Sequence, residues 1–235
     1  MKSRKINIKE VYVWEFPVRF FHWVNALAIF LLAITGYLIG NPPAIIISEE
    51  ASFSFIFGNI RFIHFTAAFV FFFNFVMRIY WGFAGNKYAK WYNYIPYKKK
   101  QWKELWCVIK VDVLQVQSRH INSIGHNALA DTVYFILFLF FLAISITGFG
   151  LYAQMSELWF PKLFEWVVPL LGGDLVARQL HHIFMWFFIV FTMIHIYLVF
   201  YHDFIERRGV TSSMIGGWKF IEEDNIKSEG VEDEI

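Results

Sequence analysis

The stretch VRFFHWVNALAIFLLAITGYLIG, residues 18–40, decides the fold. It is almost continuously apolar, yet it carries one histidine, His22, near its start. About 20 apolar residues are enough to cross a bilayer as a helix, the element that satisfies its own backbone in lipid. Similar runs follow, so the predicted spans are about 20–39, 57–81, 128–152 and 180–201. We therefore predict an all-α integral membrane four-helix bundle, with residues 1–235 forming a single domain.

The composition agrees with a membrane protein. Hydrophobic residues make up 57% of the chain and charged residues 17%, whereas soluble domains carry about 25% charged residues. The apolar runs are too continuous for the alternating strands of a membrane β-barrel. Cys107 is the one cysteine, so the chain has no internal disulfide, and without a CxxCH motif it has no covalent c-type haem.

Basic residues predict the orientation of the chain. Of its 21 Lys and Arg residues, all but Arg61, Lys162 and Arg178 lie in the N-terminal segment, the end of span two with the middle loop, or the C-terminal tail. By the positive-inside rule, both termini and the middle loop face the cytoplasm. A bacterial inner membrane, crossed several times, is the expected location.

Two segments outside the spans have distinct patterns. In the middle loop, Trp102, Leu105, Trp106 and Ile109 recur at helical spacing among lysines, which predicts an amphipathic helix. That helix either lies on the inner membrane surface or packs against a partner subunit. The tail, residues 221–235, is acidic and predicted to be disordered.

Histidines provide the strongest functional signal, because an ionisable residue inside a span is costly. With the N-terminus inside, His22 and His195 lie near the inner face, and His64 and His181 near the outer face. His181 and His195 are 14 residues apart on span four. At about 100° per residue they share one face, about 21 Å apart along the axis. His182 points about 100° away from His181 and is not an equivalent candidate.

The separation between the two depths excludes one tetrahedral metal site with four histidine ligands. It suits two planar cofactors, each held between facing helices, as in bis-histidine haem ligation. The predicted pairs are His22 with His195 and His64 with His181. For any one of them, the alternative is an interfacial histidine bonded to a backbone carbonyl.

Small residues lie near the predicted outer pair. Gly36 shares a face with His22, and Gly148 on span three follows a similar pattern: LLAITGYLIG and LAISITGFGLY both carry Thr-Gly near the outer end. Each glycine could make room for a macrocycle, or could serve ordinary small-residue helix packing. Membrane composition alone could also produce the similarity between the two stretches.

Arginines could hold the propionates of a haem. Arg61 and Arg178 each precede an outer histidine by three residues and share its face. Arg19 and Arg78 could do the same at the inner depth. The alternative is that these side chains reach to the membrane interface.

The motifs in the four spans resemble a known family over residues 14–203. The segments that carry this resemblance are PVRFFHW, ITGYLIG, IRFIHFTAAFVFFFNFVMRIYWGFAGN, IGHNALA, ITGFGLY and LHHIFMWFFIVFTMIHIY. The chain resembles the b-type cytochrome subunit of membrane-bound nickel–iron uptake hydrogenases, which is related to the formate dehydrogenase gamma subunit. The resemblance implies two b haems, ligated by His22, His64, His181 and His195.

The resemblance also implies partners. Such a subunit anchors the hydrogenase small (iron–sulfur) and large subunits in the lipid membrane and passes electrons to a quinone, menaquinone or ubiquinone. By similarity, quinone would bind beside the inner haem, near Gly125, His126, Asn127 and His195. His126 and Asn127 could instead cap span three, since Asn is a favoured N-cap.

Other functions stay open on the sequence. The chain is not an enzyme on its own, because nickel–iron chemistry needs several cysteine thiolates and Cys107 stands alone. The same cytochrome could serve another oxidoreductase, such as formate dehydrogenase. A haem-free transporter with a histidine proton relay and a purely structural anchor are the remaining alternatives. No nucleic-acid partner is expected.

Overall fold

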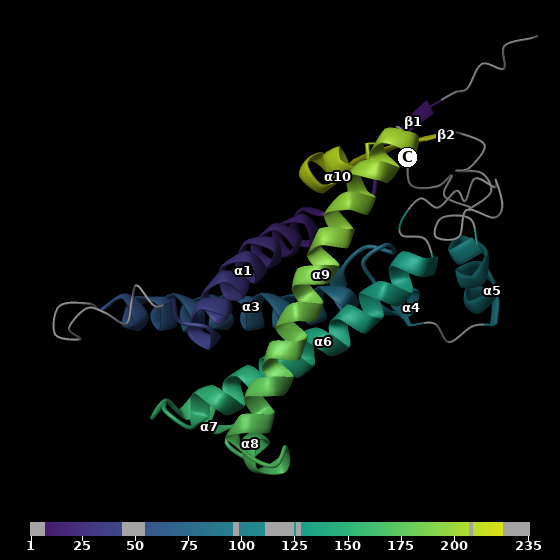
Figure 1. The fold of residues 1–235 in the computed structure, drawn as a ribbon. Coiled ribbons are helices and arrows are strands. Elements are labelled where there is room, and N and C mark those ends of the chain that lie inside the picture. Colours follow the sequence, from purple (N-terminus) through teal and green to yellow (C-terminus); the bar gives the residue numbers. More distant parts are fainter. Residues whose placement is uncertain are drawn as a thin grey trace, which may run out of the picture. The chain divides into compact units, whose positions relative to one another are not determined.

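The computed structural model describes residues 8–43, 55–95, 99–110, 125, 128–206 and 209–222. Four of its helices are long and apolar enough to cross a membrane, which confirms the predicted spans (Figure 1). They are α1 (Phe16–Gly40), α3 (Ile56–Ala84), α6 (Ala128–Ala153) and α9 (Asp174–Glu206). Helix α9 begins earlier than the predicted span, which starts at about residue 180, because Asp174 and Arg178 lower the hydropathy of its first turns. These two residues form an i,i+4 ion pair on the helix.

Shorter helices lie between the long helices and after α9. They are α4 (Trp91–Tyr94), α5 (Lys99–Val108), α7 (Trp159–Lys162), α8 (Val167–Leu170) and α10 (Val210–Gly216). Helix α5 is the helix predicted in the middle loop. Leu105 is buried on one side, while Trp102 and Trp106 are 55% and 62% exposed. The indole rings therefore remain available to a membrane surface or a partner.

A two-stranded sheet adds to the predicted all-α fold. Strand β1 (Ile8–Tyr12) pairs antiparallel with β2 (Trp218–Glu222), from Ile8 opposite Glu222 to Tyr12 opposite Trp218. Short strands at opposite ends of a chain leave no local signal of their pairing. Strand β2 also includes Ile221 and Glu222, the first two residues of the predicted tail. Residues 223–235 lie outside the described residues.

The chain forms two compact units. The first, which we call the terminal unit, consists of Met1–Phe20, Ile79–Phe138 and His195–Ile235. The second, the histidine unit, consists of Phe21–Arg78 and Leu139–Ile194. The long helices contribute residues to both units.

In the terminal unit, one carboxylate ties the start of α1 to the end of α3. Glu15 Oε2 accepts hydrogen bonds from Trp81 Nε1 and from the Asn86 backbone N–H, both at 2.9 Å. A small core packs on one face of the sheet. Its buried members are Val11, Val13, Trp14 and Ile221.

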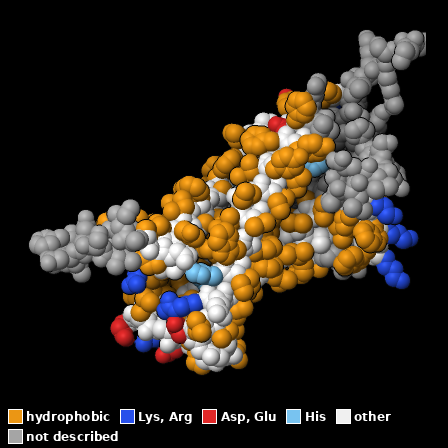
Figure 2. Space-filling view, in the orientation of Figure 1, with side chains coloured by type: hydrophobic (Ala, Val, Ile, Leu, Met, Phe, Trp, Pro, Cys, Tyr) orange, Lys and Arg blue, Asp and Glu red, His pale blue; other side chains and the backbone are white. Residues whose placement is uncertain are grey.

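In the histidine unit, polar and aromatic contacts join the helices. Asn74 on α3 is buried, and its Nδ2 donates to the Phe21 carbonyl (3.0 Å) and to Asn25 Oδ1 (2.7 Å), both on α1. The Phe149 ring of α6 lies 5.2 Å from the Phe69 ring of α3, centroid to centroid. Hydrophobic side chains cover most of the visible helix surface (Figure 2), as expected of helices that face lipid.

Candidate functional site

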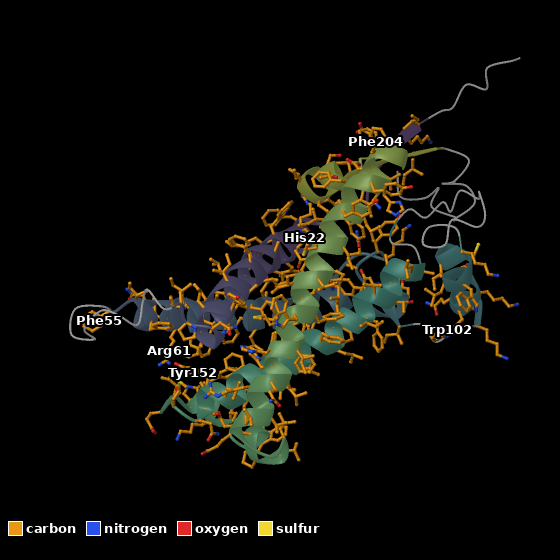
Figure 3. All side chains as sticks on the ribbon, in the orientation of Figure 1. His22, Phe55, Arg61, Trp102, Tyr152 and Phe204 are labelled. Atoms are coloured by element: carbon orange, nitrogen blue, oxygen red, sulfur yellow. The ribbon has the colours of Figure 1, made fainter. Side chains whose placement is uncertain are left out.

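The candidate site is a cavity of about 390 Å³ inside the histidine unit. Side chains of α1, α3, α6 and α9 line it, including His64 and His181. Arg61 and Tyr152, labelled in Figure 3, also belong to its lining. A volume of this size and a mainly apolar lining are typical of a small-molecule or cofactor site. We call it the histidine cavity.

Each of the two histidine rings is tethered to a threonine of a neighbouring helix. His64 Nδ1 lies 2.8 Å from Thr35 Oγ1, and His181 Nδ1 lies 3.0 Å from Thr147 Oγ1. The two threonines are the Thr residues of the repeated Thr-Gly pairs. Sequence reasoning did not identify them as ring partners, although the repeat was the signal that could have done so.

The hydrogen-bond pattern assigns the tautomer of both rings. Each threonine hydroxyl already donates its single proton to a carbonyl one turn earlier: Thr35 to Leu31 (2.6 Å) and Thr147 to Ala143 (2.9 Å). The threonine oxygens therefore act as acceptors, and the Nδ1–H groups of the rings donate to them. In a neutral imidazole this arrangement leaves the lone pair on Nε2, where it is available to a metal.

The glycines of the Thr-Gly pairs make room for the same rings. A Cβ on Gly36 would lie 3.3 Å from His64 Cε1, and one on Gly148 would lie 2.9 Å from His181 Cε1. Both glycines line the cavity. The nearest side chains to both glycines are the imidazoles. Each Thr-Gly pair therefore forms a packing site for one histidine ring, which we call a ring seat. The threonine hydroxyl orients the ring, and the absence of a glycine side chain lets the ring approach the helix.

The lining is a two-fold repeat. Five positions on α1 have counterparts on α6 at the same distances from the Thr-Gly pair, and five on α3 have counterparts on α9 at the same distances from the histidine. In order, the α1 and α6 pairs are Leu32/Ile144, Ala33/Ser145, Gly36/Gly148, Ile39/Leu151 and Gly40/Tyr152. The α3 and α9 pairs are Arg61/Arg178, His64/His181, Phe65/His182, Ala68/Met185 and Phe71/Phe188. Within the part of the chain that the structure describes, the lining residues outside these pairs are Ile29, Phe149 and Met155.

Contacts between the two halves follow the same equivalence. The Tyr37 ring of α1 packs on Trp186 of α9 (6.3 Å), as its counterpart Phe149 of α6 packs on Phe69 of α3 (5.2 Å). The Thr-Gly similarity therefore extends to side chains and contacts, beyond what membrane composition alone explains.

Arginines and a further histidine complete the lining. Arg61 and Arg178 are exposed, and Arg178 also donates from Nε to Asp174 Oδ2 (2.6 Å). His182, which the helical wheel set aside, lines the cavity as well. A Cβ on Gly40 would overlap its ring, so the glycine end of α1 admits His182. A difference of 100° on a helix does not exclude a side chain from a cavity bounded by several helices.

The residues predicted at the inner depth are divided between the two units. His22 is partly buried on α1 in the histidine unit, whereas His195 is exposed on α9 in the terminal unit. Their pairing stays a prediction. Arg19 donates from Nη1 to the Ile215 carbonyl, and Arg78 on α3 is buried.

Of the predicted quinone residues, Gly125 is described. Its carbonyl accepts a hydrogen bond from Lys219 Nζ at 3.0 Å, and a Cβ there would lie 3.1 Å from Tyr88 Cδ1. Gly125 is thus packed between a ring and an ammonium group of the terminal unit. His126 and Asn127 lie outside the described residues.

The donor set of the histidine cavity fits a haem. Among the described residues, no three His, Cys, Asp or Glu side chains come close enough to hold a metal ion together. A structural zinc site would need four such ligands. A macrocycle supplies four nitrogens to its iron, so the Nε2 atoms of His64 and His181 would supply the remaining ligands.

The ring seats predict a stability order for glycine variants. Gly148→Ala should lower the unfolding midpoint in detergent, with a cost of about 1–3 kcal/mol for overpacking against the tethered His181 ring. Gly36→Ala, with the wider 3.3 Å approach, should cost less. Gly58→Ala is the control on α3, because nothing lies within 4 Å of its added Cβ. A Gly148→Ala protein as stable as the Gly58→Ala protein would contradict the seat.

A family model covers most of the chain. The family model described as prokaryotic cytochrome b561 matches residues 13–217, which include all four long helices up to the end of α10. The residues that line the histidine cavity all fall within this match.

Curated relatives cover nearly the whole chain. A protein of Azotobacter vinelandii is 39% identical over 218 residues, 91% of this chain and 90% of its own length. One of Bradyrhizobium diazoefficiens is 41% identical over 219 residues, 92% and 88% of the two chains. Both are named probable Ni/Fe-hydrogenase B-type cytochrome subunit. A protein of Escherichia coli K12, the probable Ni/Fe-hydrogenase 1 B-type cytochrome subunit, is 35% identical over 225 residues, 93% and 94%.

These matches confirm the resemblance inferred from the motifs of the four spans. Identity extends over both halves of the repeat and both compact units. The chain belongs to the prokaryotic cytochrome b561 family and is a helical, multi-pass membrane protein.

Proposed function

We propose that this chain is the di-haem cytochrome b subunit of a membrane-bound nickel–iron hydrogenase, and that it carries electrons from the iron–sulfur subunit to quinone. One observation carries the proposal. Two imidazoles in one cavity each have Nδ1 within hydrogen-bond distance of a threonine oxygen, an arrangement that leaves Nε2 of both rings to bind iron. Haem iron, when bound, supplies one-electron chemistry that no side chain of this protein provides.

The residues of the histidine cavity would hold the first haem. His64 and His181 would hold it, and their contacts with Thr35 and Thr147 would orient the two rings. Gly36 and Gly148 keep the helices close enough for both rings to enter. Arg61 and Arg178 supply positive charge for the propionates at the same cavity.

The second haem would be held by His22 and His195. Support comes from spacing: His195 follows His181 by 14 residues and so lies on the same face of α9. Gly125, His126, Asn127 and His195 form the proposed quinone site on the cytoplasmic side. A histidine there suits the transfer of protons to a reduced quinone.

The basic residues support an orientation with both termini in the cytoplasm and the histidine cavity toward the periplasm, in the bacterial inner membrane. In that orientation the hydrogenase would dock outside and release protons there, while quinone would take up protons inside. Dihydrogen oxidation would then build a proton-motive force.

The names of the relatives support a hydrogenase partner over the runner-up, another quinone-linked oxidoreductase such as formate dehydrogenase. Membership in a cytochrome family argues against the haem-free transporter. A purely structural anchor has no need for two rings tethered in one tautomer.

The haem content of single variants tests the cytochrome assignment. Purified wild-type protein should hold two b haems in its reduced-minus-oxidised spectrum and by pyridine haemochrome assay. His64→Ala and His195→Ala should each lose one, and a different one, while His202→Ala should keep both. A wild-type protein without haem would overturn the assignment, and one haem lost in both variants would overturn the two-site arrangement.

The threonine tethers predict an effect on haem affinity that acts through the histidine rings. Thr147→Val keeps the shape of the side chain but removes the acceptor for His181 Nδ1–H, so the ring becomes a weaker donor to iron. We expect the haem of the histidine cavity to bind about 10–100-fold more weakly, measured by haem loss to apomyoglobin. Thr35→Val should behave alike. Thr132→Val on α6 is the control, because its hydroxyl bonds only the Ala128 carbonyl. Equal haem loss in all three variants would contradict the tether.

Purification from native membranes tests the partner. The tagged chain should co-elute with nickel, and the complex should reduce quinone with dihydrogen. His64→Ala should retain the nickel but lose dihydrogen-dependent quinone reduction, because electron transfer through the haem is lost while the chain still binds the hydrogenase. Co-elution of a formate-oxidising partner without nickel would favour the runner-up, and full quinone reduction by His64→Ala would favour the structural anchor.

A further inference from the structure

The repeat of the histidine cavity is broken at four of its ten pairs of positions. The pairs that differ in chemical character are Ala33/Ser145, Gly40/Tyr152, Phe65/His182 and Ala68/Met185. In each pair the larger or more polar member lies on α6 or α9. The two halves therefore present different side chains to a ligand whose axial histidines are equivalent.

Packing accounts for three of these differences. The Tyr152 ring stacks on Phe65, with centroids 4.1 Å apart, and the His182 ring fills the space beside Gly40. Met185 is buried, and its Sδ lies 3.4 Å from the position of a Cβ on Gly36. His182 and Met185 thus occupy space beside glycines, and Tyr152 packs against an aromatic ring.

Packing does not account for Ser145. Its side chain is 6% exposed and lines the cavity, and its Oγ has no hydrogen-bond partner within the described part of the chain. Serine and threonine inside helices usually donate to the carbonyl four residues earlier, as Thr147 does to Ala143. Ser145 makes no such bond, and an unsatisfied buried hydroxyl is unfavourable unless something occupies the cavity beside it.

We propose that Ser145 sets the redox potential of the haem held in the histidine cavity. This inference rests on the proposed function. The iron–porphyrin core carries one more positive charge when oxidised than when reduced. A hydroxyl with no fixed partner can turn its oxygen toward that charge, whereas a methyl group cannot, and the low dielectric of the interior strengthens the effect. Ser145 therefore stabilises the oxidised form and lowers the potential.

The repeat provides a reciprocal experiment. Redox titration of the purified protein, followed in the α-band, should show two waves, and the one absent from His64→Ala belongs to the histidine cavity. Ser145→Ala should shift that wave to a more positive potential and leave the other unchanged. Ala33→Ser places a hydroxyl at the equivalent position of the other half and should shift the same wave to a more negative potential.

Ser213→Ala is the matched control, because Ser213 is a fully buried serine outside the cavity whose hydroxyl already donates to the Val210 carbonyl (2.7 Å). It should move neither wave. An unchanged or more negative wave in Ser145→Ala, or shifts of the same sign in the two cavity variants, would overturn the inference while leaving the cytochrome assignment intact. A wild-type protein without haem waves would overturn both.

Discussion

The hydrogen bond from an imidazole Nδ1–H to a threonine oxygen is the interaction on which the rest of the site depends. Alone, a histidine in an apolar helix can rotate and can carry its proton on either nitrogen. Thr35 and Thr147 remove both freedoms for His64 and His181, because each hydroxyl proton is already committed to its own helix. The cavity between four helices thereby presents two oriented imidazole nitrogens, which are the ligand atoms of the proposed haem.

Several features of this arrangement could be predicted from the sequence. Continuous apolar runs determine the four spans, and the depth of histidines in those spans selects His64 and His181 as a pair. The helical period alone could not find the threonines, because their role depends on a contact between helices. The same limit applies to His182: a helical wheel gives its direction from its own axis, but not the position of Gly40 on the neighbouring helix.

The sheet of the terminal unit shows a different limit. IKEVY and WKFIE are five-residue strands near opposite ends of the chain, and each is too short to be distinguished from a loop by its pattern. The pairing depends on tertiary contacts, including the packing of Val13 and Trp14 beneath the strands. Such long-range pairing becomes visible only when the helices that bring the segments together are known.

The repeat gives the histidine cavity pairs of equivalent residues, whereas the proposed inner site has no such pairs. Counted from the same landmarks, the position of His195 on α9 corresponds to Arg78 on α3, and that of His22 on α1 corresponds to Tyr134 on α6. Histidines therefore match between α3 and α9 at the outer depth, but the inner histidines have no matching histidine in the other half of the repeat. Axial ligands there would come from helices of opposite halves at positions that the repeat does not duplicate. Two haems with the same ligand type would then have different surroundings, and different surroundings give different potentials. The potentials of the donor and the acceptor would set the direction of electron flow, and by departing from its own repeat this chain would give the haems between them unequal potentials.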